Sequence, residues 1–543
     1  ATLNPGQPSA RELQGGAQAV FRIPLSINQF VSFRISQRRI ILQVTLFDPA
    51  GKQLVTTSNP AGGSGPIYVS EITALSGDYK LEVRSTEDWA IPGSFEVSVE
   101  ELKASNPQDA RLVEAERWFA KGLQESESRA YPVAIEAYKK ALPYWQSVHH
   151  AHWEALTNYA LGQTYYLTRN LVDSDKSYAQ VLEIKLAPDD WRIRAAALND
   201  LGLNARLQGK NEIAISRLNE SLKSFEDHAD RRGQASSLNN LAAAYGQMGE
   251  LRKALEYAQR ALPLREAENF QSGVNNLKNT LGTIYDRLGD PEKALEYHSQ
   301  ALKSWLQLSQ AKQLDSSDRL GNALNSVALV SAKLGKWDEA AQSYDEALKV
   351  PNTSAALRAA ILNNRGEFYS SLGDFDTATR YLSEANALLD SQKAPDPDLK
   401  ASVLFQIGQI HVATGHLGEA IATFQEAKLA KPNKPKRAYV LTALGEAWSR
   451  QGNAPEAMRA YAEALEIQME IEDKRGQALT RQKLGEAYAV ANNFAAALTE
   501  YQSALSLWRA VAGDDRAVRR RFRARAEGVD LGADRSAHRP GRD

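Results

Sequence analysis

The sequence predicts a mainly α-helical fold class, a right-handed α-solenoid of about ten helix pairs preceded by a small all-β sandwich domain. Two observations lead to this prediction. Small residues recur about every 40 positions from residue 108 to residue 512, among apolar residues at helical spacing. Residues 1–104 instead alternate apolar and polar side chains, as strands with one buried face do.

Composition and charge exclude several classes of protein. The 543 residues contain 65 Lys and Arg against 66 Asp and Glu, so no global field attracts nucleic acid or an anionic membrane. There is no cysteine, which excludes disulfides, thiolate metal sites and a cysteine nucleophile within this chain. No apolar run is long enough for a transmembrane helix.

The β-sandwich is predicted from short runs rich in Val, Ile and Phe that are separated by Gly- and Pro-containing turns. About six to eight antiparallel strands are expected in this length of chain. The clearest runs are residues 19–25, 30–36, 41–47, 79–84 and 95–100.

Gly15 with Gly16, residues 46–52 (LFDPAGK) and residues 76–83 (SGDYKLEV) resemble the bacterial pre-peptidase C-terminal type of β-sandwich. The resemblance implies an accessory domain of an exported protein that binds a ligand or acts as a spacer. An inert cap on the solenoid is the alternative interpretation. Because the chain begins with Ala1 and not Met, we expect a processed or trimmed N-terminus and an extracytoplasmic location, periplasmic or secreted, with a cytoplasmic location left open.

Residues 106–109 (NPQD) form the predicted junction, with Asp109 or Ser105 expected to cap the first helix. Beyond it, residues 281–302 show the repeating unit most clearly. Gly289 ends one amphipathic helix, Asp290 caps the next, and Pro291 occupies its first position. Neither helix can bury its apolar face alone, so the unit requires neighbours of its own kind.

The neighbouring copies are marked by a small residue that follows an apolar one at intervals of 37 to 46 residues. An aromatic residue usually stands three positions later, a glycine seven positions later and an alanine twelve positions later. The small residues are Gly162, Gly202, Ala242, Gly282, Ala328, Gly366, Gly408, Gly445 and Gly485.

This pattern, LG-x-x-Y…G…A…A, resembles the tetratricopeptide repeat, whose usual period is about 34 residues. A period near 40 is similar to the arrays of kinesin light chains and spindle-orientation adaptors. Residues 230–235 (DRRGQA) and 473–478 (DKRGQA) are near copies, which indicates duplication.

Asparagines lie three residues before the small residue in five consecutive repeats, and a second asparagine follows in two of them. Asparagine is unfavourable inside a helix, and it carries both a donor and an acceptor, so a row of them can hold the backbone of an extended peptide. The resemblance to kinesin light chains implies the same role. The alternative is that each amide bonds to the preceding repeat. The positions are Asn199, Asn239, Asn240, Asn279, Asn325, Asn363 and Asn364.

Gln247, Arg287 and Lys333 complete the predicted peptide-binding groove, which carries no single dominant charge. We expect a protein or peptide partner, no nucleic acid and no cofactor. His149 and His152 share a helix face at a spacing that a weak metal site would need. However, no carboxylate or thiol joins them at ligand spacing, so we predict no metal site.

No phosphate-binding loop, nucleophile elbow or zinc-protease motif occurs in the sequence, so we predict that the chain is not an enzyme. The order of sandwich and repeats resembles the front part of bacterial proteins that end in a caspase-like CHAT peptidase domain. Residues 516–543 hold nine arginines and no apolar stripe, and we interpret residues 513–543 as a disordered tail in preference to a nucleic-acid-binding arm.

Three functions therefore remain open from the sequence. The first is a non-catalytic scaffold that binds a partner in the groove. The second is the regulatory part of a CHAT-type peptidase whose catalytic domain is absent from this chain. The third makes the sandwich the binder of carbohydrate or a surface ligand, with the helices as a spacer. The oligomeric state is not predicted.

Overall fold

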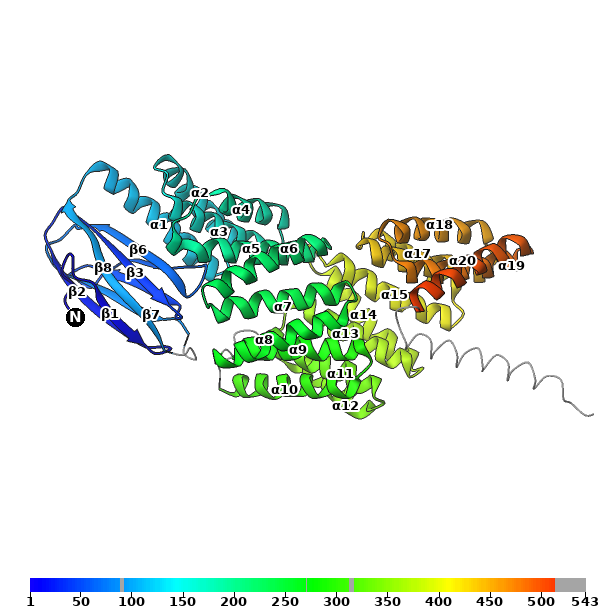
Figure 1. The fold of residues 1–543 in the computed structure, drawn as a ribbon. Coiled ribbons are helices and arrows are strands. Elements are labelled where there is room, and N and C mark those ends of the chain that lie inside the picture. Colours follow the sequence, from blue (N-terminus) through cyan, green and yellow to red (C-terminus); the bar gives the residue numbers. More distant parts are fainter. Residues whose placement is uncertain (88–91, 270, 312–316, 513–543) are drawn as a thin grey trace, which may run out of the picture. The chain divides into compact units, whose positions relative to one another are not determined.

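The structure, a computed structural model, describes residues 1–87, 92–269, 271–311 and 317–512. They fall into two compact units, Ala1–Gln310 and Ala311–Asp543, which are treated one at a time. The predicted fold class, a helical solenoid after a small β-sandwich, is confirmed (Figure 1). The predicted tail at residues 513–543 lies outside the described residues. None of the described helices is both long and apolar enough to cross a membrane.

Two four-stranded antiparallel sheets form the sandwich, in the orders β1-β8-β3-β6 and β2-β7-β4-β5. Inward-facing residues such as Phe33, Leu46, Leu81 and Val97 are fully buried between the sheets, as the alternation predicts. The strands are β1 (Ser9–Leu13), β2 (Gln18–Leu25), β3 (Gln29–Arg38), β4 (Leu42–Phe47), β5 (Gln53–Ser58), β6 (Ser64–Ile72), β7 (Gly77–Ser85) and β8 (Gly93–Ala104).

The first helix is capped differently from the prediction. Asn106 is the N-cap, and its Oδ1 accepts from the backbone N–H of Gln108 and Asp109 at 2.8 and 3.1 Å. Asp109 instead returns a bond to the Asn106 N–H, which makes a reciprocal capping box. Pro107 at the first position disfavours a helical backbone at the preceding residue, so Asn106 stays extended and takes the cap position in place of Asp109 or Ser105.

Helices of the first unit follow one another as antiparallel pairs. They are α1 (Pro107–Glu127), α2 (Tyr131–Ser147), α3 (Ala151–Leu167), α4 (Leu171–Glu183), the 3₁₀ turn η1 (Pro188–Asp190), α5 (Trp191–Leu207), α6 (Asn211–Asp227), α7 (Arg231–Gln247), α8 (Leu251–Ala267), α9 (Gln271–Leu288) and α10 (Pro291–Gln310).

The second unit continues the same pairing. Its helices are α11 (Ser317–Lys333), α12 (Trp337–Lys349), α13 (Ala355–Ser371), α14 (Phe375–Asp390), α15 (Pro397–Ala413), α16 (Leu417–Leu429), α17 (Lys434–Arg450), α18 (Ala454–Glu470), α19 (Lys474–Val490) and α20 (Phe494–Ala512).

Within a pair, the recurring small residue lies where the two helices touch. A Cβ on Gly162 would stand 2.5 Å from the Tyr178 ring, and one on Gly282 would stand 2.6 Å from the His298 ring. The alanines twelve positions later, such as Ala294, have no exposed surface. Close helix approach therefore explains both kinds of small residue in the repeat.

The unit at residues 281–302 folds as predicted. Gly289 has a φ of 83°, the left-handed conformation that ends α9. Asp290 Oδ1 then accepts from the Lys293 N–H at 3.1 Å, and Pro291 begins α10.

Candidate functional site

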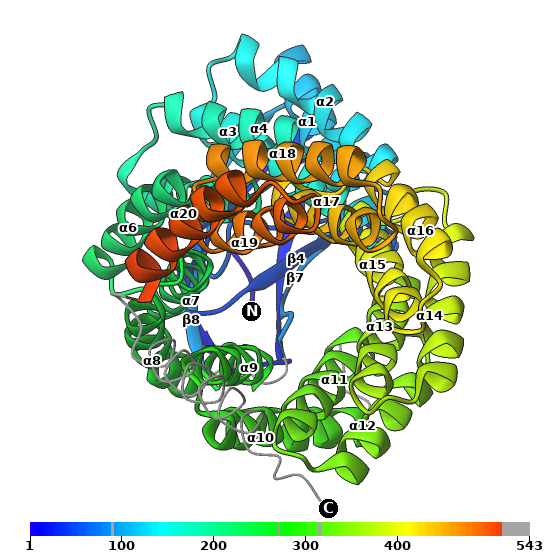
Figure 2. The same ribbon diagram turned by 90° about the vertical axis from the view of Figure 1, so that its right-hand side faces the viewer.

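The odd-numbered helices of each unit form one layer and the even-numbered helices form the other, as α11 to α18 show in Figure 2. Successive odd-numbered helices also pack against one another, as α5 does on α7 and α13 on α15. No comparable packing joins successive even-numbered helices of the described residues. The odd-numbered layer is therefore the concave side of each unit, and its accessible surface is called the odd-helix face below.

The predicted asparagines all lie on odd-numbered helices, and the amide oxygens of Asn199, Asn239 and Asn325 connect neighbouring repeats. Asn199 Oδ1 accepts from Ser237 Oγ and from Asn240 Nδ2, both at 3.2 Å. Asn239 Oδ1 accepts from the hydroxyl of Thr280 at 3.4 Å. These bonds run from one repeat to the next, which is the tie that the alternative interpretation expects.

The same arrangement recurs in the second unit, where Asn325 Oδ1 accepts from Asn364 Nδ2 at 3.1 Å. Asn363 is buried and donates to Asn364 Oδ1 at 3.4 Å. Asn279 differs, since its Oδ1 bonds to His298 Nδ1 at 3.2 Å within its own pair. Burial lowers the pKa of His298 to about 4, so this ring is neutral at pH 7.

The amide nitrogens of some of these asparagines form no hydrogen bond, even where the amide oxygen does. Among the described residues, Nδ2 of Asn239, Asn279 and Asn325 makes no hydrogen bond. Asn239 and Asn279 are partly accessible, whereas Asn325 is only 9% exposed. The hydrogen bonds within the array therefore use the Oδ1 acceptors of these asparagines and leave their Nδ2 donors on the odd-helix face.

The remaining predicted groove residues are exposed at the C-terminal ends of odd-numbered helices: Gln247 on α7, Arg287 on α9 and Lys333 on α11. Arg287 also donates to the backbone oxygen of Gly246, so it fastens α9 to α7.

Of the histidines between residues 149 and 152, His152 is buried in a structural contact, whereas His149 is exposed. His152 Nδ1 lies 2.7 Å from Asp190 Oδ1, with both side chains buried, and its ring packs edge-on against Tyr68. His149 is instead the exposed turn residue before α3, with a φ of 52°. No group of three or more His, Cys, Asp or Glu that could hold a metal ion occurs in the part of the chain that the structure describes.

The β-sandwich is joined to the first helices by specific polar contacts. Buried Glu116 on α1 accepts from the N–H and the hydroxyl of Ser70 on β6, at 2.6 and 2.9 Å. Arg117 Nη2 donates to both carboxylate oxygens of Glu71, at 2.7 and 2.8 Å. Tyr68 completes the contact within the aromatic cluster of α1 to α3. Packing of this kind is expected if the sandwich serves as a cap that covers the first helix pair.

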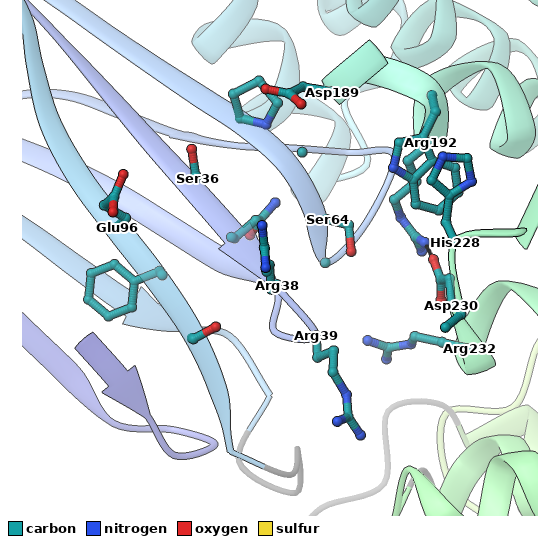
Figure 3. Close-up of a pocket in the computed structure, with 18 of the residues that line it drawn as sticks. Ser36, Arg38, Arg39, Ser64, Glu96, Asp189, Arg192, His228, Asp230 and Arg232 are labelled. Carbon is teal, nitrogen blue, oxygen red and sulfur yellow. Dashed lines mark ion pairs between the residues drawn. The ribbon is translucent and has the colours of Figure 1, made fainter. Parts of the chain in front are cut away.

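A pocket of about 970 Å³ opens between the sandwich and the helices of this unit, and is called the junction pocket. Figure 3 shows Arg38 and Arg39 on the sandwich wall, opposite Arg192, Asp230 and Arg232 on the helical wall. The lining also includes the serines Ser36, Ser64 and Ser94 and the acidic residues Glu96, Asp189 and Glu268.

Most charged groups of the junction pocket are paired. Arg192 donates to the oxygen of Ala61 at 2.9 Å and pairs with Asp230. Burial lowers the pKa of Arg192 to about 10, which still leaves the guanidinium charged at pH 7. The pair of Arg34 with Asp189, at 2.8 Å, also spans the sandwich and the helices.

Comparison with protein families and relatives agrees with this architecture. Family models described as tetratricopeptide repeat match residues 190–267 and 357–428, residues 405–470, and residues 276–304. The chain contains tetratricopeptide repeats. The matched segments include most of the asparagine positions on the odd-helix face.

Among relatives, a probable UDP-N-acetylglucosamine–peptide N-acetylglucosaminyltransferase SPINDLY of Hordeum vulgare is 30% identical over 181 residues, 29% of this chain and 18% of that protein. The chain therefore spans less than a fifth of that relative. Among solved structures, the quorum sensor NprR of B. thuringiensis is 16% identical, with a TM-score of 0.45 over 67% of this chain and 99% of that one. A tetratricopeptide repeat protein of Parabacteroides merdae is 19% identical, with a TM-score of 0.39 over 54% of this chain and 99% of that one.

The junction pocket was not predicted from the sequence, although one signal pointed to it. In the sequence, the segment DRRGQA at residues 230–235 indicates duplication of tetratricopeptide repeats. In the structure, Asp230 caps α7 through the Gly233 N–H at 3.0 Å, while Arg231 and Arg232 line the pocket. Two consecutive arginines also stand at the end of β3, where Arg38 is the last residue of the strand and Arg39 follows it.

Proposed function

We propose that this chain is a non-catalytic scaffold that binds a protein or peptide partner on the odd-helix face of its tetratricopeptide repeats. The observation that carries the proposal is the pair of unused Nδ2 donors of Asn239 and Asn279 in the first unit, whose oxygens are already bonded to neighbouring side chains. In the second unit, Asn325 offers the same kind of donor. A fixed amide presents its donor in one direction without further loss of side-chain entropy.

An extended peptide offers a carbonyl oxygen at every residue, so such donors can hold its backbone with little dependence on its sequence. In the first unit, the exposed Gln247 and Arg287 add polar contacts of differing charge at the edge of this face, and Lys333 holds the corresponding position in the second unit. Repeat arrays use extended concave surfaces of this kind for binding. These features support a partner of mixed charge that contacts several repeats.

The test begins with ten-residue peptides selected from a random display library on the full chain. Replacing Asn239 and Asn279 by Asp keeps the acceptor oxygens of the ties and removes the Nδ2 donors. Each lost bond costs about 0.5–1.5 kcal/mol, so peptide affinity should fall roughly 5- to 100-fold in the double variant. Replacement of the same two residues by Ala should weaken binding at least as much.

Asn219 provides the control, because it is an exposed asparagine on α6, an even-numbered helix. Asn219→Asp adds the same charge per site on the opposite layer and should leave peptide affinity unchanged. Unchanged affinity in the double Asp variant, with a normal melting curve, would show that these asparagines serve only as structural ties.

A further inference from the structure

We propose that the junction pocket is a second binding site, which takes an acidic segment of a polypeptide and holds its carboxylates with Arg38 and Arg231. This site lies between the sandwich and α5 to α8, away from the asparagines of the odd-helix face. Its test uses other residues, so either proposal can fail without the other.

The first argument is the charge that remains after the internal pairs are formed. Six arginines and four acidic residues line the pocket. Arg34, Arg192 and Arg39 pair with acids of the lining, Arg39 more loosely with Glu268 at 3.7 Å, and Arg232 pairs with Glu87 beyond it.

Arg38 and Arg231 are the exceptions. Both are exposed, and neither side chain forms an ion pair or hydrogen bond among the described residues. Arg38 ends β3 on the sandwich wall, and Arg231 begins α7 on the helical wall. A ligand in the pocket would therefore meet an unpaired guanidinium from each wall, and guanidinium groups bind carboxylates with two parallel hydrogen bonds.

The second argument is that the walls are held in place before any ligand arrives. Arg192 ties Ala61 of the sandwich to Asp230 of the helical wall. Gly62 allows this contact, since a Cβ there would lie 2.4 Å from Arg192 Nη2. Its φ of 118° is also one that only glycine adopts readily. A preformed cavity loses less entropy on binding than a flexible surface does.

The third argument favours a polypeptide over a simple anion such as phosphate. Glu96 lies opposite Ser36 in the β3–β8 ladder, diagonal to Arg34 and Arg38 on the same sheet face. Its carboxylate would repel a compact dianion but accept hydrogen bonds from peptide N–H groups. The three serine hydroxyls of the lining can donate to peptide carbonyl oxygens.

The experiment measures retention of two labelled decapeptide pools by the immobilised full chain. One pool carries two glutamates at random positions, and the matched pool carries glutamine at the same positions. We expect retention of the glutamate pool at least ten-fold above the glutamine pool, and the excess should fall as salt is raised because the contacts are ionic. Equal retention of the two pools would overturn the proposal.

Variants then locate the site. Arg38→Gln and Arg231→Gln should each lower retention of the glutamate pool several-fold, and the double variant should abolish the excess. Arg252→Gln is the matched control, because Arg252 is an exposed arginine at the opposite end of α8 from Glu268. Retention that survives the double variant, or that inorganic phosphate abolishes at the concentration of the peptide carboxylates, would overturn the assignment.

Discussion

Glu116 provides a test of how the sandwich is joined to the solenoid. Burial raises its pKa from 4.5 to about 7, with a smaller contribution from the negative charge of Glu71, while the two hydrogen bonds from Ser70 oppose the rise. Arg117 pairs with Glu71 on the same contact. The carboxyl of Glu116 therefore binds its proton more tightly in the folded protein than in the unfolded chain.

The sign of the pH effect follows from the raised pKa. Below pH 4.5 both states are protonated and the contact has its full stability. Between pH 4.5 and pH 7 the unfolded chain loses the proton first, so the contact becomes less stable as pH rises. A shift from 4.5 to about 7 corresponds to about 3 kcal/mol, all of it lost above pH 7.

Glu116→Gln removes the titration and keeps a similar shape. Hydrogen exchange read by mass spectrometry on peptides from β6 and α1 gives the opening free energy of this contact. At pH 8 the variant should exceed the wild type by up to about 3 kcal/mol, and at pH 4.5 the difference should be small. Glu114→Gln changes an exposed carboxyl on the same helix and should leave the profile unaltered. Parallel pH profiles for the wild type and Glu116→Gln would refute the reasoning.

Three further predictions concern stability and are read from circular dichroism melting curves. Gly162→Ala puts a Cβ 2.5 Å from the Tyr178 ring and should cost about 1–3 kcal/mol, whereas Gly418→Ala meets nothing within 4 Å and should be neutral or slightly stabilising. Asn106→Ala breaks the capping box of α1 and should cost about 1 kcal/mol, so an unchanged curve would contradict the cap assignment. Trp145→Ala empties a fully buried site and should cost about 3–5 kcal/mol, and a loss below 1 kcal/mol would show that this site collapses.

Most of the fold could be predicted because its signals are local. The alternating runs in residues 19–25, 30–36 and 79–84 correspond to β2, β3 and β7. The repeat of small residues predicted the helix pairs, since two helices approach closely where a side chain is small or missing, as at Gly282. Propensity rules placed the cap of α1 at Ser105 or Asp109, one residue before or three residues after Asn106, because Asn106 and Asp109 both take part in the capping box.

The sites were harder to predict, because they depend on contacts between distant segments. The asparagine row was found from its register, but only the structure shows that the oxygens of Asn199, Asn239 and Asn325 bond to the next repeat. The end of β3 and the start of α7 both line the junction pocket, and no spacing in the sequence predicts that they come together. Export and the resemblance to CHAT-type peptidases stay predictions.

The central claim is that a partner lies on the odd-helix face, and site-specific photocrosslinking tests it most directly. Asn276 on α9 and Asn219 on α6 are both exposed asparagines, one on each layer. A photoreactive phenylalanine derivative at either position, illuminated with a peptide selected on the full chain, reports which layer the peptide contacts. We predict a crosslink from position 276 and none from position 219; a crosslink from 219 alone would contradict the account.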